Sequence, residues 1–295
     1  MKKRLTRFLP FLLAFTIALP SYSVFAEEEN QAKETQTNET NKTQADETTA
    51  NDTLSLAAET AVLIDAASGE ILYDKDADKK MYPASITKLM TILLALENGK
   101  LTDEITFSHD AVYNIEPGSA HIAILEGETL TLEQVLRAII LRSANEASNG
   151  VAEYVDGSVE AFAKHMTERA KELGCTNTNF VNANGLFDEN HYTTAHDMAL
   201  IARELLKHEE YRSMMSETDY EIPPTNLQTE TRYLHGQHQM LNPNSIYYYK
   251  DAIGGKTGYT VEAGNTLVTY AERDGLTLIA VVMKCNGAEH YTDTA

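Results

Sequence analysis

Strand patterns lie near both ends of this 295-residue chain, and helix patterns lie between them. Residues 59–78 predict two strands joined by a turn at residues 68–69, because apolar and β-branched residues flank a Ser-Gly pair. Residues 245–285 predict further strands with turns at 262–264 and 273–275. A sheet must bury its apolar face against another layer. We therefore expect an α+β fold, in which one antiparallel sheet formed from both chain ends is covered by a mainly helical central region.

The central helices carry recognisable start and stop signals. Pro83 suits the first turn of an apolar helix, and Gly99 suits its end. We expect this helix to be buried on most sides. Each of three further helices begins at a hydroxyl residue that can cap its first turn: Thr131, which forms a capping box with Gln134; Ser158, before a helix closed by Gly174; and Thr194, with Asp197 in the first turn.

The first 55 residues differ in composition from the rest of the chain. A basic start, an apolar run at residues 8–20 and the small residue Ala26 are typical of a secretory signal peptide over residues 1–26. Residues 27–55 are acidic and polar, which predicts a disordered linker. We therefore expect an exported protein, located at the extracytoplasmic face of the cell membrane, in the cell wall or secreted, with its folded domain at residues 56–295.

The net charge disfavours certain binding partners, and the number of cysteines argues against a fold held together by disulfides. The formal net charge is −20 at pH 7, and such a surface repels nucleic acid and anionic membranes. Cys175 and Cys285 are too few for a disulfide scaffold, so we expect two buried thiols. His191 and His196 lack a metal-binding pattern, and we expect them to serve in packing or at the surface. We expect neither a metal nor an organic cofactor.

Three short motifs occur in order along the chain. They are Ser-x-x-Lys at Ser85 and Lys88, Ser-x-Asn at Ser143 and Asn145, and Lys-Thr-Gly at Lys256, Thr257 and Gly258. Each motif alone has an ordinary structural explanation, such as a helix cap, a linker or a strand end. Together, and in this order, they form the set described for penicillin-binding proteins and class A β-lactamases.

The first motif has a direct chemical interpretation. Residues three apart share a helix face, so Ser85 and Lys88 should point the same way. A serine hydroxyl needs a base to become a strong nucleophile. The positive end of a helix and apolar surroundings both disfavour a protonated lysine. We expect Ser85 to cap the helix and Lys88 to lie one turn behind it as the base. The simpler alternative is a plain cap and a solvated charge.

From about Thr60 to its end, the chain resembles D-alanyl-D-alanine carboxypeptidases, which are low-molecular-mass penicillin-binding proteins. The resemblance rests on PASITKLMT, SVEAFAKHMTERAKELGCTNTNFVNANGL, HYTTAHDMALIARELL and IGGKTGYTVEAGNTLVTYAERDGLTLIAVVM. It implies a β-lactamase/transpeptidase-like catalytic domain at residues 56–295. It also implies a serine peptidase of cell-wall biosynthesis that removes the terminal D-alanine from peptidoglycan stem pentapeptides through an acyl-enzyme. β-Lactams would inhibit such an enzyme covalently.

The resemblance also implies roles for the residues of the first two motifs. Ser85 would be the nucleophile and Lys88 the base. Ser143 would relay a proton toward the leaving D-alanine. Asn145 would orient Lys88 and the amide of the substrate.

The third motif is expected to bind the substrate along a strand. By resemblance, Lys256 would supply positive charge, and Thr257 would bind the terminal carboxylate. Gly258 would let the strand approach the substrate closely. The oxyanion hole would use the backbone N–H groups of Ser85 and Tyr259.

Two departures from the family pattern stand out at the end of the chain. Family members often carry an arginine after the final strand that holds the substrate carboxylate, whereas residues 285–295 contain none and His290 is a weak substitute. The family also continues with a helix, and often with a second domain and a membrane-anchoring tail. We therefore expect this chain to be truncated, with any membrane association depending on a segment that it lacks.

Two alternative functions are kept open. A class A β-lactamase would need a Glu-x-x-Leu-Asn pattern after the second motif, and no such pattern follows Asn145; we expect Glu189 to be solvated. A non-catalytic peptidoglycan- or penicillin-binding module would have no physical need for both Lys88 and Lys256. Covalent acylation by a β-lactam separates this module from the enzyme.

Overall fold

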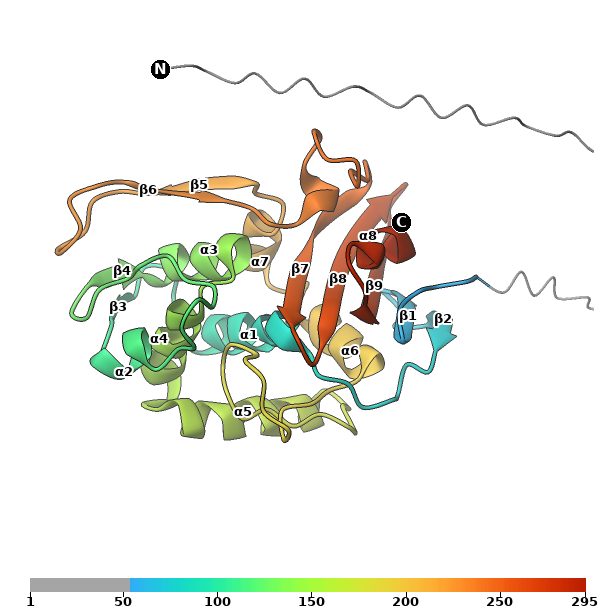
Figure 1. Ribbon diagram of the computed structural model, residues 1–295, viewed down its shortest axis with the longest axis horizontal. Helices are drawn as coiled ribbons and strands as arrows, with labels where there is room; N and C mark the ends of the chain where they lie inside the picture. Colours follow the sequence, from blue (N-terminus) through green and yellow to red (C-terminus); the bar gives the residue numbers. More distant parts are fainter. Residues whose placement is uncertain (1–53) are drawn as a thin grey trace, which may run out of the picture. The chain divides into compact units, whose positions relative to one another are not determined.

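Five antiparallel strands join the two ends of the folded chain into one sheet (Figure 1). The computed structural model describes residues 54–295, so the predicted signal peptide and nearly all of the predicted linker lie outside the described residues. The strand order is β2–β1–β9–β8–β7. The strands are β1 (Thr60–Asp65), β2 (Ile71–Lys75), β7 (Ala252–Thr260), β8 (Gly264–Arg273) and β9 (Leu276–Cys285). The predicted α+β fold with a sheet built from both ends is confirmed.

The segment between β2 and β7 is mainly helical. The longer helices are α1 (Lys88–Asn98), α3 (Leu132–Arg142), α4 (Asn145–Asp156), α5 (Val159–Glu172) and α6 (Ala195–Leu205). The short helices are η1 (Ala84–Thr87), α2 (His109–Tyr113), α7 (Glu209–Met214), η2 (Gln239–Leu241) and α8 (Glu289–Thr294). Two small hairpins complete the fold: β3 (Glu104–Thr106) with β4 (Thr129–Thr131), and β5 (Asp219–Ile222) with β6 (Arg232–His235). Figure 1 shows the β5–β6 hairpin extending beside α3.

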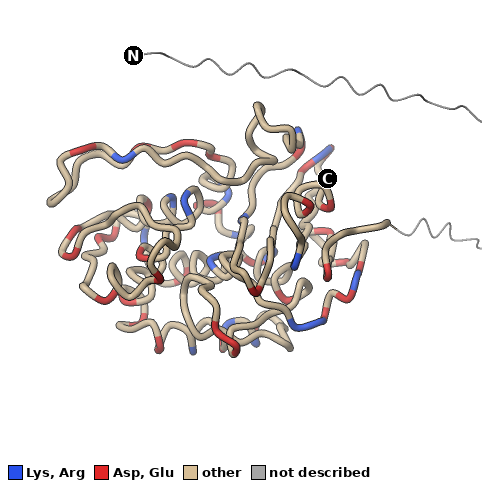
Figure 2. The backbone as a smooth tube through the Cα atoms, viewed as in Figure 1, with Lys and Arg blue, Asp and Glu red and all other residues tan. Residues whose placement is uncertain are grey.

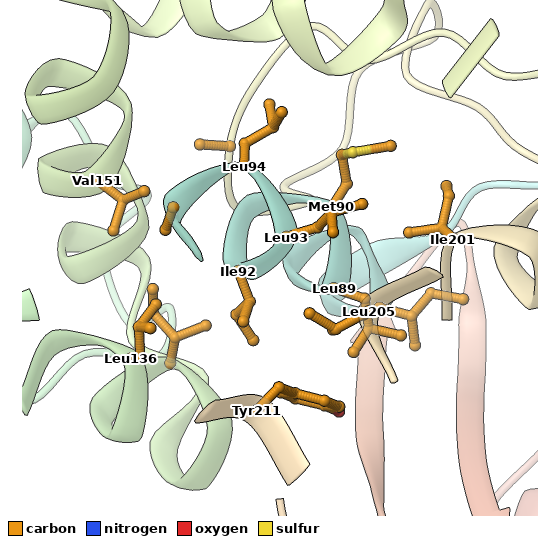
Figure 3. Packing of buried hydrophobic residues seen from close by; sticks show 14 of the residues in the cluster. Leu89, Met90, Ile92, Leu93, Leu94, Leu136, Val151, Ile201, Leu205 and Tyr211 are labelled. Atoms are coloured by element: carbon orange, nitrogen blue, oxygen red, sulfur yellow. The ribbon is translucent and has the colours of Figure 1, made fainter. Parts of the chain in front are cut away.

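Helix α1 forms the centre of the main hydrophobic core. It packs against α6, which covers β1 and β9, and against α3 and α4. All side chains of residues 88–94 are fully buried, and those of Leu89, Ile92 and Leu93 contact apolar side chains from the surrounding elements (Figure 3). Each buried Leu or Ile contributes about 1.5–3 kcal/mol to stability through the apolar area it removes from water. This packing places Lys88, the first residue of α1, in the protein interior.

The helix caps predicted at Thr131, Ser158 and Thr194 form as expected, but one predicted strand segment does not. Thr131 and Gln134 make both hydrogen bonds of a capping box, and Ser158 caps α5. Residues 245–251, predicted to be part of a strand, form turns instead. The reason is that the N–H of Tyr249 donates to the carbonyl of Met240, so this backbone is used within the loop and not in a sheet.

The outer face of the sheet carries a smaller apolar cluster. Tyr291 from α8 packs there with Leu267 and Val282, so this short helix covers part of the face. Cys285 lies in the same cluster, and Cys175 lies in the main core; both are buried thiols. Within residues 54–295, no helix is both long and apolar enough to span a membrane.

Asp197 ties the start of α6 to the loop that follows α5. Its buried carboxylate accepts hydrogen bonds from the N–H of Asn177 at 2.9 Å and from the hydroxyl of Thr178 at 2.7 Å. We expect Asp197→Ala to lower the free energy of unfolding by about 3 kcal/mol, because buried donors lose their acceptor. Urea denaturation measures the change. Glu160→Ala, which removes an exposed acid from the first turn of α5, should cost less than about 1 kcal/mol. Equal losses for the two variants would contradict this account.

Candidate active site

The turn that carries Ser85 differs from the predicted helix start. Residues 84–87 form the 3₁₀ turn η1, and α1 begins only at Lys88. Ala84 has a φ of 50°, a left-handed conformation that is costly for a residue other than glycine. Ser85 makes no capping hydrogen bond, so the prediction that it caps the helix is wrong. Its hydroxyl is instead 2.9 Å from the amine of Lys88, which leaves it free of the helix backbone.

Lys88, the first residue of α1, is fully buried directly after this turn. Its Nζ lies 2.9 Å from Ser85 Oγ, 2.8 Å from Asn145 Oδ1 and 2.5 Å from the carbonyl oxygen of Asn184. Burial lowers the pKa of Lys88 well below its ordinary value, and the charge of Lys256 lowers it further. The carboxylate of Glu146 opposes this shift and raises the pKa.

The three neighbours of Lys88 suit a neutral amine. A neutral amine has two N–H donors and one lone pair. The oxygens of Asn145 and Asn184 accept and cannot donate, so they take both N–H groups. The lone pair then faces the hydroxyl of Ser85, which can donate its proton. A base and a nucleophile would need this separation, which is within hydrogen-bond reach.

The second lysine, Lys256, joins β7 to the loop between α3 and α4. Its Nζ lies 3.1 Å from Ser143 Oγ and 2.7 Å from the carbonyl oxygen of Thr257. Burial lowers the pKa of Lys256 to about 7. Ser143 ends α3 in a left-handed conformation with a φ of 57°. A second amine–hydroxyl pair therefore lies across the site from the first.

Strand β7 lies directly against the turn that carries Ser85. A Cβ added at Gly258 would be 2.4 Å from Thr266 Oγ1 and 2.8 Å from the backbone nitrogen of Ser85. The hydroxyl of Thr266 also donates to the carbonyl of Pro83 at 2.9 Å. The absence of a side chain at Gly258 thus permits the approach. It brings the backbone of Thr257 and Tyr259, on either side of Gly258, beside Ser85; the ring of Tyr259 is 63% exposed.

The structure therefore gathers the three motifs into one site. Hydrogen bonds connect Ser85, Lys88 and Asn145, and another connects Ser143 to Lys256. Thr257, Gly258 and Tyr259 lie on the adjoining strand. The side chain of Thr257 makes no hydrogen bond within residues 54–295.

Three further residues lie at the site and were not predicted. Asn184 lies 96 residues from Lys88 in sequence and accepts its hydrogen bond, and Gly185 has no room for a Cβ, which would be 1.9 Å from the carbonyl oxygen of Ala84. Glu146 is buried; one oxygen accepts from the N–H of Ile122 at 2.7 Å, and the other has no hydrogen-bond partner among residues 54–295. Burial raises the pKa of Glu146. Its place directly after Asn145 was a sequence signal for it, whereas only the fold reveals Asn184.

The side chains of His191, His196 and His290 contact other protein side chains. His191 is buried and hydrogen bonds Thr87, and burial lowers its pKa to about 3. His196 pairs with Asp78 at 3.0 Å. His290 is buried on α8, with its ring 4.0 Å from that of Tyr291, and makes no side-chain hydrogen bond within the described part of the chain.

The chain is similar to known proteins over most of its length. The protein family described as D-alanyl-D-alanine carboxypeptidase matches residues 44–287. The D-alanyl-D-alanine carboxypeptidase DacF of Bacillus subtilis is 38% identical over 78% of this chain and 58% of its own length. DacA of Haemophilus influenzae is 31% identical over 96% of this chain and 66% of its own length. The chain thus spans 58% and 66% of the length of these two relatives.

A shorter relative is covered more fully. The D-alanyl-D-alanine carboxypeptidase of Streptomyces sp. strain K15 is 30% identical over 78% of this chain and 81% of its own length. The crystal structure of the Streptomyces K15 DD-transpeptidase has a TM-score of 0.75 at 26% identity, covering 81% of this chain and 95% of that one. The fold is thus shared with this DD-transpeptidase over nearly its whole length.

Proposed function

This chain belongs to the D-alanyl-D-alanine carboxypeptidase family, and on that premise we propose that it is a serine carboxypeptidase that removes the terminal D-alanine from peptidoglycan stem pentapeptides. Ser85 is the nucleophile, and β-lactams acylate it. The signal-peptide pattern at residues 1–26 supports export and action outside the cytoplasm.

The observation that carries this proposal is the set of contacts around Lys88. Two carbonyl oxygens accept from the buried amine of Lys88, and Ser85 Oγ lies 2.9 Å from the same amine, so a neutral Lys88 has its lone pair available to that hydroxyl. A binding module gains nothing from this arrangement, because burying an amine costs free energy unless the group is needed. A β-lactamase would need a carboxylate for a deacylating water, and Glu189 is exposed, as expected for a solvated side chain.

Acylation follows from these positions. Lys88 takes the proton of Ser85 as its oxygen attacks the carbonyl carbon of the penultimate D-alanine. The backbone N–H groups of Ser85 and Tyr259 stabilise the negative oxygen of the tetrahedral intermediate. The C–N bond then breaks, and the proton that Lys88 took from Ser85 is relayed through the hydroxyl of Ser143 to the departing amine of D-alanine. Water hydrolyses the Ser85 ester and restores the enzyme.

Positive charge near β7 holds the end of the substrate. The terminal carboxylate lies at Thr257, within the field of Lys256. The described chain carries many acidic residues over its surface (Figure 2), so the protonated Lys256 makes a locally positive site in a negative exterior. Asn145 orients the substrate amide and Lys88.

The first test is release of D-alanine from a stem pentapeptide by the purified protein, with benzylpenicillin blocking that release. No release by a folded protein would contradict the proposal.

The rate of acylation should depend on pH through Lys88. Lys88 accepts a proton only when neutral, and its pKa lies well below the ordinary value of 10.5. The neutral fraction, and with it the second-order rate constant for acylation by benzylpenicillin, should rise with pH through this lowered pKa and level off before pH 10.5. Quenched-flow experiments with benzylpenicillin measure this rate constant at each pH. A rate constant that begins to rise only near pH 10.5 would contradict a neutral Lys88.

Gly258→Ala should impair catalysis more than it impairs folding. The added Cβ meets the hydroxyl of Thr266 and the backbone nitrogen of Ser85, so β7 must move away from the oxyanion hole. We expect a loss in kcat of about 10²–10³-fold, as for removal of one oxyanion donor. Steady-state release of D-alanine measures it, and circular dichroism checks the fold. Activity within twofold of the wild type would show that β7 does not form the hole.

A further inference from the structure

Glu146, the second residue of α4, is a buried acid that the proposed mechanism does not use. It is 1% exposed, and within residues 54–295 no basic side chain forms an ion pair with it. Burying a carboxylate without an ion pair is unfavourable. A titratable group held in this way beside a catalytic base is a candidate for a role in the reaction.

Glu146 joins the first turn of α4 to the loop between α2 and β4. Its Oε1 accepts a hydrogen bond from the N–H of Ile122 at 2.7 Å. In the opposite direction, the N–H of Asn145 donates to the carbonyl of Ala120 at 2.9 Å. The side chain of Asn145 accepts from the amine of Lys88 at 2.8 Å. The two hydrogen bonds to the loop therefore hold in place the residue that orients the base.

The contacts of Glu146 favour its ionised form at neutral pH. Burial raises the pKa of this carboxyl group from its ordinary value of 4.5, while the N–H groups of Ile122 and Ile124 and the nearby His121 lower it. Backbone N–H donors favour a carboxylate over the neutral acid. Neither lysine nor arginine lines the pocket of about 330 Å³ beside Glu146, so no permanent cation there neutralises it. We therefore expect a negative charge directly after Asn145.

Lys256, Glu146 and His191 are the titratable groups from other elements that face Lys88. Burial lowers the pKa of Lys88 most, the charge of Lys256 on β7 lowers it further, and the carboxylate of Glu146 raises it. His191, in the segment before α6, is neutral at pH 7 because burial lowers its pKa to about 3. Among the residues that the structure describes, Glu146 is thus the group that opposes the fall in the pKa of Lys88.

We propose that Glu146 is a positioning residue for acylation: its carboxylate holds the loop between α2 and β4 on the first turn of α4 and places one negative charge beside the base Lys88. The inference rests on the proposed function and adds a residue outside the three motifs to its machinery. Glu146 acts through Asn145 and Lys88, not on the substrate. The hydrogen bond to Ile122 keeps Asn145 in place, and the charge keeps Lys88 basic enough to take the proton of Ser85.

Glu146→Gln tests the charge, because glutamine keeps the shape of the side chain and an acceptor for the N–H of Ile122. Without the negative charge the pKa of Lys88 falls, so the rise of the acylation rate constant with pH should move to lower pH by at least about 0.5 pH unit. At a pH below both midpoints, the fraction of the plateau reached should be at least about threefold larger than in the wild type. The plateau itself should fall about two- to tenfold, since Lys88 becomes a weaker base. Quenched-flow experiments with benzylpenicillin measure both quantities.

Two more variants complete the experiment. Glu146→Ala removes both the charge and the acceptor, so it should show the same midpoint shift with a lower plateau than Glu146→Gln, and it carries the test if Glu146→Gln misfolds. Glu153→Gln is the matched control. Glu153 lies on the same helix and accepts from the hydroxyl of Ser108 at 2.8 Å, but it is not among the groups that shift the pKa of Lys88. This control should move the midpoint by less than about 0.5 pH unit.

A midpoint shift smaller than about 0.5 pH unit in the folded Glu146 variants would overturn the inference, because a purely structural role lowers the rate without moving the profile. An equal shift in Glu153→Gln would overturn it as well, since the effect would not be specific to Glu146. If the folded wild type formed no adduct with benzylpenicillin, the proposed function would fail together with this inference. Acylation of the wild type with unmoved midpoints in the variants would leave the proposed function intact and reject only the role of Glu146.

Discussion

Ser85→Ala should abolish the release of D-alanine, with kcat falling by at least about 10⁴-fold, the order of loss seen when a serine nucleophile is removed. The hydroxyl is the atom that forms the acyl bond, and within the described residues its hydrogen bonds go only to Lys88 and the carbonyl of Asn184. The fold should survive, because this side chain caps no helix. The measurement is D-alanine released from a stem pentapeptide under saturating conditions.

Ser213→Ala is the matched control for this prediction. Ser213 is exposed on α7 and donates a hydrogen bond to the carbonyl of Glu210. Its replacement should leave kcat within twofold of the wild type. Substantial turnover by a Ser85→Ala preparation free of wild-type enzyme would require another nucleophile.

Lys88→Met should lower the rate of acylation by about 10²–10⁴-fold, the usual contribution of a general base. Methionine keeps an unbranched side chain in the apolar surroundings of α1 and removes the lone pair that faces Ser85. The substitution also leaves the oxygens of Asn145 and Asn184 without their donor, so some stability is lost. The measurement is the second-order rate constant for acylation by benzylpenicillin at a pH where the wild-type rate has levelled off.

The pH profile separates a catalytic from a structural effect of this substitution. If Lys88 is the base, the rise of the rate with pH disappears in Lys88→Met. Lys164→Met, at an exposed position of α5, should change neither the rate nor the profile. A Lys88→Met variant that keeps the wild-type profile at a reduced rate would assign the titration to another group.

Local sequence patterns predicted the parts of the structure that depend on neighbouring residues. The capping box at Thr131 and the cap at Thr194 are local hydrogen bonds, and both form. The spacing of Ser85 and Lys88 predicted that their side chains meet, and they do. The sheet from both chain ends followed from the placement of strand patterns and from the need to cover an apolar face.

Features that depend on tertiary contacts could not be read from the chain. The turn at Ala84 takes a left-handed conformation because the surrounding packing imposes it, which replaces the predicted helical cap at Ser85. The carbonyl of Asn184 reaches Lys88 only because a loop folds over the start of α1, with Gly185 against Ala84. Every residue has a backbone carbonyl, so a side-chain motif cannot predict which carbonyl accepts this hydrogen bond.

The central claim is that Ser85 forms a covalent acyl-enzyme, and intact-mass spectrometry after incubation with benzylpenicillin tests it most directly. We expect the folded wild-type chain to gain the mass of one penicillin, peptide mapping to place the adduct on Ser85, and folded Ser85→Ala to gain no mass. A folded wild-type chain that gains no mass, or an adduct mapped to another residue, would contradict it.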